Sequence, residues 1–136
     1  MPNPADFADR YVALWNEPDA DARRTAIAEL WAPDGRHILQ PPRETVDSAA
    51  ALGLAATFEA HGHRELEQRV RLAYDEFVAP GHFTFRRRPE VTKVSDAIKF
   101  TWEMVSATGE VAGVGTEFLL VDSAGQIVAD YQFIES

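Results

Sequence analysis

Two acidic residues in the C-terminal third of the chain, Glu117 and Asp130, are the side chains best placed to do chemistry. Each lies in a run rich in β-branched and aromatic residues, and a polar, glycine-containing stretch at 122–125 separates the two runs. This pattern is typical of a β-hairpin. If the turn pairs Val121 with Gln126, antiparallel registry places Glu117 directly opposite Asp130.

An opposed pair of carboxylates is suited to acid–base chemistry. On neighbouring strands their Cβ atoms lie about 4.5–5.5 Å apart. Two negative charges so close do not ionise together readily, and burial raises the pKa further, so one acid keeps its proton near neutral pH. The pair then offers one acid and one base, as enolisation, cyclisation or epoxide opening requires. Two other arrangements remain open: the pair faces solvent at a sheet edge, or an arginine such as Arg36 neutralises each acid.

A second hairpin just upstream, turning at 108–109, predicts what surrounds the pair. Pairing Ala107 with Glu110 places Trp102 opposite Gly115, which leaves room beside the indole. Because side chains alternate between the two faces of a strand, one face collects an aromatic and acidic set that looks like a pocket wall. Trp102 could be plain core or an aromatic wall for a ligand. The residues on this face are Phe100, Trp102, Met104, Glu117, Leu119, Asp130 and Gln132.

The opposite face of the same strands is predicted to be too apolar to remain in water. Either helices or a second subunit must cover it, and an uncovered patch of this kind normally marks an interface. We therefore predict a homodimer that packs through the sheet. The residues concerned are Val114, Phe118, Leu120, Ile127, Ala129, Tyr131 and Phe133.

The elements upstream of these hairpins are mostly helical. Hydrophobic periodicity and turn residues predict helices at 4–17, 19 to about 31, about 45–59 and about 64–78, with strands at 36–40 and 82–87. Tyr11 and Trp15 lie on the apolar stripe of the first helix, where core packing explains them at least as well as a role in a pocket. Helices followed by three long antiparallel strands over 98–134 indicate an α+β fold.

Length and composition exclude several classes of function. A chain of 136 residues is expected to form a single domain over 1–136. The net charge of −9 argues against nucleic acid and anionic membranes as partners. There is no apolar run of about 18 residues, so no transmembrane helix is expected. The N-terminus lacks the features of a signal peptide, and we expect a cytoplasmic protein.

No metal or cofactor is predicted. The chain has no cysteine. The alternating residues Glu59, His61, His63 and Glu65 could suggest a metal cluster, but an isolated His-x-His in a loop between helices seldom holds the required geometry. The phosphate-binding, dinucleotide-binding and serine-hydrolase glycine motifs are all missing from the sequence.

Three segments carry a resemblance to a known superfamily: Tyr-Val-Ala-Leu-Trp at 11–15, Leu-Trp-Ala-Pro-Asp-Gly at 30–35, and Gly-Thr-Glu-Phe-Leu-Leu-Val-Asp at 115–122 followed by Gly-Gln-Ile at 125–127. With the order of elements, they make nearly the whole chain resemble the nuclear transport factor 2-like superfamily, which includes SnoaL-like polyketide cyclases, ketosteroid isomerases and limonene epoxide hydrolases. The resemblance implies a cone in which a curved, mostly antiparallel sheet wraps around the N-terminal helices and encloses a pocket. It also implies a homodimer.

The resemblance suggests roles for several residues. Ketosteroid isomerases place a neutral carboxylic acid on the strand where Glu117 lies, and an oxyanion-hole tyrosine near Tyr11. Their catalytic aspartate aligns with Gln40, which cannot act as a base. Asp130 approximates one aspartate of the epoxide hydrolases, whose Arg-x-Asp pair corresponds to Lys-Phe-Thr at 99–101. His37 is a second candidate base at its natural pKa, although alternation leaves open whether His37 or Gln40 points inward.

We therefore predict an enzyme without metal or cofactor, of the isomerase, cyclase or epoxide-opening type, for a small hydrophobic carbonyl or cyclic substrate. Asp130 or His37 would be the base, Glu117 the acid and Tyr11 a hydrogen-bond donor. One alternative is a non-catalytic module that binds a hydrophobic ligand or a protein, since fold alone decides little. A structural subunit is the third possibility. The residues predicted to contact the ligand are Trp15, Gln40, Phe100, Trp102 and Gln132.

Overall fold

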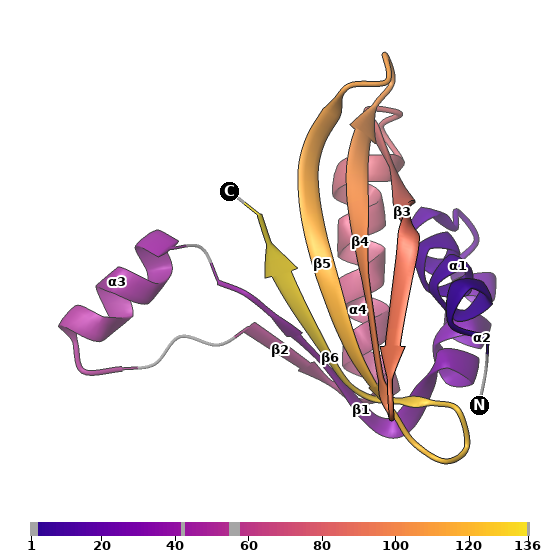
Figure 1. The fold of residues 1–136 in the computed structure, drawn as a ribbon. Helices are drawn as coiled ribbons and strands as arrows, with labels where there is room; N and C mark the ends of the chain where they lie inside the picture. The colour runs from indigo at the N-terminus through magenta and orange to yellow at the C-terminus, as the bar shows by residue number, and fades with distance from the viewer. Residues whose placement is uncertain (1–2, 42, 55–57, 136) are drawn as a thin grey trace.

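A curved, mixed sheet of six strands forms the body of the protein (Figure 1). The computed structural model describes residues 3–41, 43–54 and 58–135. The strands are β1 (Trp31–Leu39), β2 (Phe58–His61), β3 (Phe83–Val94), β4 (Ala97–Ser106), β5 (Val111–Val121) and β6 (Ile127–Ile134). Their order is β2-β1-β6-β5-β4-β3, in which only the pair formed by β1 and β6 is parallel. The predicted α+β cone architecture is confirmed.

The first two helices form as the sequence predicts. Helix α1 (Pro4–Asn16) begins with a proline, and the side chain of Asn3 caps it by accepting a hydrogen bond from the Asp6 amide at 3.1 Å. Helix α2 (Ala20–Leu30) is capped in the same way by Asp19. Both helices lie on one side of the sheet (Figure 1). Their apolar stripes bury Phe7, Tyr11, Leu14, Ile27 and Leu30 against it.

Strand β1 begins earlier than predicted. The segment expected to form a turn before it, 33–35, is an irregular stretch within the strand, where the pairing with β6 shifts between Trp31 and Arg36. Gly35 is required at this point, because a Cβ atom there would lie 2.7 Å from the Ile127 carbonyl oxygen and 2.7 Å from the Trp31 side chain. Turn-forming residues therefore mark a distortion of the strand rather than its start.

The predicted helix at 45–59 is wrong in its second half. Helix α3 (Arg43–Ala51) ends before Gly53, which has a φ of 73°, and residues 58–61 form β2 at the edge of the sheet. Residues 55–57 of this prediction lie outside the described residues. Alanine-rich composition favours a helix locally, but pairing with β1 places Ala60 opposite His37 and buries it. Helix α3 stands away from the body (Figure 1).

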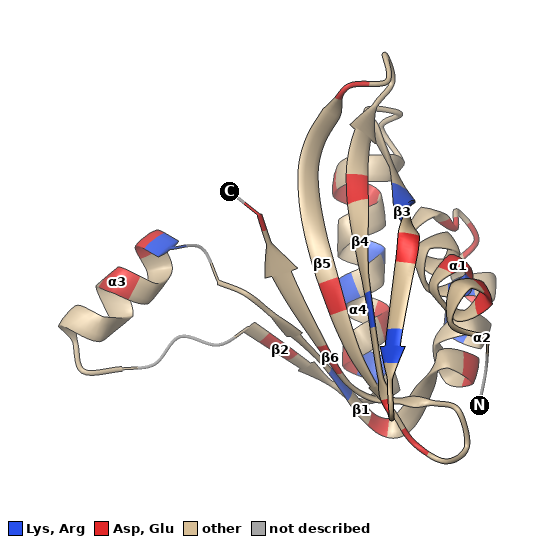
Figure 2. Cartoon of the chain, in the orientation of Figure 1, with Lys and Arg blue, Asp and Glu red and all other residues tan. Residues whose placement is uncertain are grey.

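Helix α4 (Gly62–Ala73) packs on the same side of the sheet as α1 and α2 (Figure 1). It begins two residues before the predicted start and continues as a π-helical segment, η1 (Tyr74–Val78). None of the helices in the described part of the chain combines the length and apolar character that a membrane span requires. Figure 2 shows acidic and basic positions on α1 and α2, and basic positions near both ends of β3 with an acidic one between them.

The register of β4 on β5 is confirmed, and that of β5 on β6 is wrong by two residues. Phe100 faces Glu117 and Trp102 faces Gly115, as predicted. Across the second hairpin Glu117 faces Gln132, and Asp130 faces Leu119 instead of Glu117. The turn holds one residue more than expected, and a bulge between Leu120 and Val121 adds a second. A shift by two residues leaves Glu117 and Asp130 on their predicted face, so the two acids still share one side.

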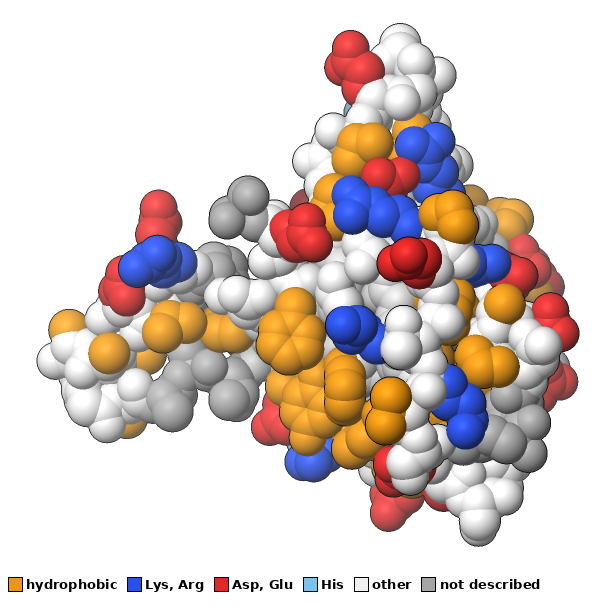
Figure 3. Space-filling view, in the orientation of Figure 1, with side chains coloured by type: hydrophobic (Ala, Val, Ile, Leu, Met, Phe, Trp, Pro, Cys, Tyr) orange, Lys and Arg blue, Asp and Glu red, His pale blue; other side chains and the backbone are white. Residues whose placement is uncertain are grey.

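The outer face of the sheet is apolar near β1 and β6 but does not contain every residue predicted for it. Ile127 lies beyond the bulge and is buried in the core beside Val121. Val114, between two glycines, borders the cavity described below. Phe133 is 54% exposed, and hydrophobic side chains gather on this face next to the base of the α3 arm (Figure 3). Tyr131, Phe133 and Ile38 line a shallow hollow there.

Candidate active site

A cavity of about 460 Å³ opens between the helices and the sheet, at the ends of the strands away from the core. Its size is in the range of small-molecule sites, which are usually mostly apolar with a few polar groups. The apolar part of its wall comes from Val12, Leu39, Phe58, Phe77, Phe85 and Met104. The polar part comes from Tyr11, His37, Arg69, Glu117 and Gln132.

Glu117 is a buried carboxylic acid in the wall of this cavity. It is only 1% exposed, and its Oε1 accepts a hydrogen bond from the Trp102 indole at 2.9 Å. Its Oε2 receives no hydrogen bond from the described residues, and the carboxyl group also shares a hydrogen bond with Asp130. Burial, and then the neighbouring charge of Asp130, raise the pKa of Glu117 well above its usual value of 4.5. The raised pKa favours the protonated form of Glu117, which can donate a hydrogen bond.

Trp102 reaches Glu117 only because the facing residue is a glycine. A Cβ atom at Gly115 would lie 2.2 Å from the indole Cζ2 atom, so any larger residue would displace the ring. The ring also packs edge-on against Phe85, with centroids 5.5 Å apart. Because Gly115 has no side chain, the Trp102 indole can lie in the position from which it donates to Glu117.

Asp130 lies behind the cavity wall and is fully buried. Its Oδ2 accepts a hydrogen bond of 2.5 Å from the Tyr11 hydroxyl and lies 3.8 Å from His37 Nε2, while its Oδ1 has no partner among the described residues. Burial and the charge of Asp130 raise the pKa of Tyr11, so Tyr11 stays a phenol. Tyr11 therefore donates its hydroxyl proton to Asp130, whereas the sequence predicted donation to a substrate.

His37 is held in one tautomer by Arg69. The guanidinium Nη1 lies 3.0 Å from His37 Nδ1. Because arginine has only donors, Nδ1 must accept this bond and Nε2 must carry the proton, which it donates to Gln132 Oε1 at 2.9 Å. Burial, reinforced by the charge of Arg69, lowers the pKa of His37. The imidazole is therefore neutral and has no free lone pair for the role of base considered for it above.

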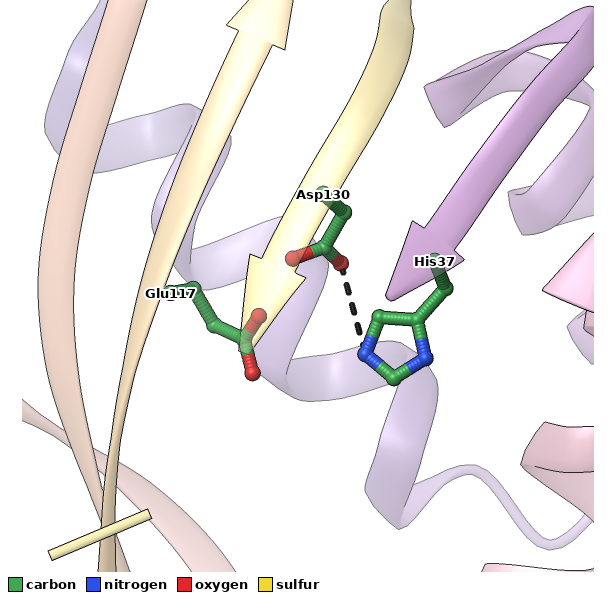
Figure 4. Close-up of side chains that lie close together, drawn as sticks. All are labelled: His37, Glu117 and Asp130. Carbon is green, nitrogen blue, oxygen red and sulfur yellow. Dashed lines mark ion pairs between the residues drawn. The ribbon is translucent and has the colours of Figure 1, made fainter. Parts of the chain in front are cut away.

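Figure 4 shows the side chains of His37, Glu117 and Asp130 pointing toward one another from β1, β5 and β6. Each offers a ligand atom, and the three atoms lie within 4.8 Å of one another, close enough to surround a cation. A cation would need the Nε2 lone pair, and therefore the other tautomer of His37 beside the charged Arg69. This geometry suits proton transfer better than metal binding. The candidate metal ligands 59–65 do not converge, since His63 bonds to the Trp31 carbonyl oxygen at 2.9 Å.

The predicted ligand-contact residues divide into two groups. Trp15, Gln40, Trp102 and Gln132 line the cavity. The Trp15 ring lies 5.6 Å from that of His37, and its Nε1 is buried with no partner among the described residues. Phe100 does not reach the cavity: it is buried in the core, edge-on to Tyr11 at 5.5 Å, because the strand face continues past the end of the cavity.

Arg69 was not among the site residues predicted from the sequence. In α4 this residue follows the buried Leu66 by three positions and precedes Val70, which is also buried, so it lies beside the apolar stripe. A charged residue beside the buried stripe of a helix is the feature of the sequence that could have identified Arg69. The alternative that Arg36 neutralises the acids is wrong, since Arg36 binds the Tyr131 hydroxyl at 3.4 Å.

No protein-family model and no curated protein matches the chain. Solved structures do match it. A SnoaL-like family protein from Agrobacterium tumefaciens, proposed to be an isomerase, is 21% identical with a TM-score of 0.79, and the match covers 100% of both chains. A SnoaL-like protein of unknown function from Burkholderia thailandensis is 14% identical with a TM-score of 0.66, and the match covers 98% of this chain and 95% of that one.

A third match is a protein of unknown function from Catenulispora acidiphila with a ketosteroid isomerase-like fold, in complex with trimethylamine. It is 12% identical with a TM-score of 0.59, and the match covers 93% of this chain and 83% of that one. Likeness at these levels of identity establishes the fold.

Proposed function

We propose, from the premise that this chain has the nuclear transport factor 2-like fold of SnoaL-like proteins, that it is an acid–base enzyme without cofactor. Its substrate would be a small, mostly apolar molecule with a carbonyl or ring oxygen, bound in the 460 Å³ cavity. The observation that carries this proposal is the buried pair of Glu117 and Asp130, in which an acid with a raised pKa lies on an apolar cavity wall and shares a hydrogen bond with the second carboxyl group.

Glu117 would act on the substrate oxygen. A neutral carboxylic acid in a site that excludes water stabilises a developing oxyanion more strongly than the same group does in water, because fewer competing dipoles surround it. The Trp102 bond fixes the carboxyl group through Oε1, and the acid proton would turn from Asp130 to the substrate oxygen. The acid would therefore be positioned before the substrate arrives.

Asp130 would receive the proton that the substrate releases. Because Asp130 lies behind the wall, the proton would pass through the Tyr11 hydroxyl, which lines the cavity and already donates to Asp130. Tyr11 would take the substrate proton as it gives its own to Asp130, while Glu117 gives its proton to the substrate oxygen. The pair then ends with one proton, as it began, now on Asp130.

A second candidate function, a non-catalytic ligand-binding module, is favoured by a separate observation. Asp130 does not line the cavity, and both nitrogens of His37 are occupied by Arg69 and Gln132. A ligand would then meet a hydrogen-bond donor without a directly exposed base. The same fold serves many functions, so this observation has to be tested directly.

The test follows deuterium exchange at the carbon beside the carbonyl of apolar cyclic ketones in D₂O, with binding measured by tryptophan fluorescence. Under the enzyme proposal the wild-type protein accelerates exchange, and Glu117→Gln, Asp130→Asn and Tyr11→Phe each lose the acceleration while binding persists. Binding without exchange in the wild-type protein supports the module instead. Exchange that survives Glu117→Gln contradicts the role proposed for this acid.

A further inference from the structure

The side-chain polar atoms left without a partner around the cavity are hydrogen-bond donors. Trp15 Nε1 is buried and has no partner among the described residues. Gln132, which lines the cavity, uses its oxygen to accept from His37, which leaves its amide nitrogen without a bond to the described residues. The orphaned acceptor nearby, Asp130 Oδ1, does not line the cavity. A ligand that satisfies these donors must carry hydrogen-bond acceptors.

Arg69 adds a positive charge to these donors. Its hydrogen bonds to described residues all come from Nη1, which contacts His37 Nδ1, the His37 carbonyl oxygen and the Phe58 carbonyl oxygen. Within the described ranges no carboxylate lies within 4 Å of its guanidinium. Burial lowers the pKa of Arg69, but a guanidinium remains charged at neutral pH. Its planar fork is matched to the two oxygens of a carboxylate.

We infer that the ligand of this cavity is an apolar carboxylate, bound by Arg69 through its anionic group. The Trp15 indole and the Gln132 amide are further donors on the same wall. The inference deepens the proposed function and rests on it for one point, that a second oxygen of the ligand, a carbonyl or ring oxygen, faces Glu117. The substrate class is therefore an oxo acid with an apolar body.

The inference makes Arg69 a binding residue in addition to its contact with His37. The charge of the whole chain is −9, so an anion gains nothing from the long-range field and depends on this one guanidinium. Substituting Arg69 should therefore remove the preference for an anion while leaving the apolar contacts. If Arg69 served only to orient His37, its loss would change the tautomer of the imidazole and leave the preference of the cavity for an anionic ligand unaltered.

The experiment compares 4-oxo-4-phenylbutanoate with its methyl ester, which differs only in the anionic group. Binding to the full chain is measured at pH 7.5 by tryptophan fluorescence, with calorimetry as a second readout. The acid should bind the wild-type protein about tenfold or more tightly than the ester, as expected for a hydrogen-bonded ion pair. Arg69→Met should abolish this preference and leave the affinity for the ester nearly unchanged. Arg71→Met, on an exposed position of the same helix, is the matched control.

Equal binding of acid and ester to the wild-type protein would overturn the inference, and so would a preference that survives Arg69→Met. Nitrogen NMR of the His37 ring shows whether Arg69→Met changes the tautomer, which separates the two roles of the arginine. Tight binding of the acid without deuterium exchange in either compound would leave the inference standing and refute catalysis. Equal binding and equal exchange of acid and ester would refute the inference of a carboxylate ligand and leave the proposed catalysis standing.

Discussion

Adding one methyl group at Gly115 should break the contact that fixes Glu117. The new Cβ atom would lie 2.2 Å from Cζ2 and 2.5 Å from Cε2 of the Trp102 ring, well inside van der Waals contact. The indole must therefore move, and its 2.9 Å bond to Glu117 Oε1 is lost with it. Overpacking of this kind costs about 1–3 kcal/mol, and a buried acceptor left without its donor adds about 1–3 kcal/mol at most.

The matched control lies two residues away on the same strand. A Cβ atom at Gly113 would meet the Met104 side chain at 3.6 Å, an ordinary contact, and neither glycine has a positive φ. Gly113→Ala should therefore be neutral or slightly stabilising, since alanine is favoured over glycine within a strand by roughly 0.5–1 kcal/mol. The comparison isolates the clash with the indole from the general effect of replacing a glycine.

Urea unfolding and tryptophan fluorescence measure both parts of the expectation. Gly115→Ala should lower the free energy of unfolding by about 2 kcal/mol relative to Gly113→Ala and change the emission of Trp102. Because the Trp102 bond favours the charged form of Glu117, its loss should also raise the pKa of that acid further. A Gly115→Ala protein as stable as Gly113→Ala, with unchanged emission, would refute the account of how Glu117 is held.

Three further predictions concern the buried acids and the outer face. Because the folded-state pKa of Glu117 lies above 4.5, its stabilising contribution is present below that pH and is lost as the pH rises toward the raised value, so Glu117→Gln should gain stability over wild type between pH 5 and 8 in urea unfolding. If the free energy of unfolding of Glu117→Gln changes with pH in the same way as that of the wild-type protein, the raised pKa of Glu117 is contradicted. Tyr11→Phe should lower stability by about 1–3 kcal/mol at pH 7, measured in the same way, because Asp130 loses its phenol donor; a neutral effect would argue that Asp130 does not depend on that bond. For the proposed homodimer, Phe133→Glu on the exposed apolar face should yield a monomer in analytical ultracentrifugation, and an unchanged mass would place the interface elsewhere or exclude it.

Period-two alternation was enough to place the two acids on one face, because a side chain changes sides only when the register slips by an odd number. The slip between β5 and β6 is two residues, from a longer turn and a bulge at Leu120 and Val121, so Glu117 and Asp130 remain neighbours although they are not opposite each other. A bulge of this kind depends on packing around the turn, and the local sequence does not specify it.

Local propensity failed where tertiary pairing decided the structure. The alanine-rich stretch after Thr45 favours a helix, but residues 58–61 instead complete the sheet beside β1, where Phe58 reaches the cavity. Arg69 was missed for a related reason. Its contact with His37 joins α4 to β1 across 32 positions of sequence, and the direction in which a helix faces is set by what it packs against.

We conclude that burial and the proximity of Asp130 raise the pKa of Glu117 well above 4.5 and favour its neutral form. The most direct test is a carboxyl-carbon NMR titration of Glu117, in the wild-type protein and in Asp130→Asn. We expect Glu117 to titrate well above 4.5 in the wild-type protein. In Asp130→Asn it should titrate lower but still above 4.5, because burial is the larger cause of the shift. A Glu117 that titrates near 4.5 in both proteins would contradict the account.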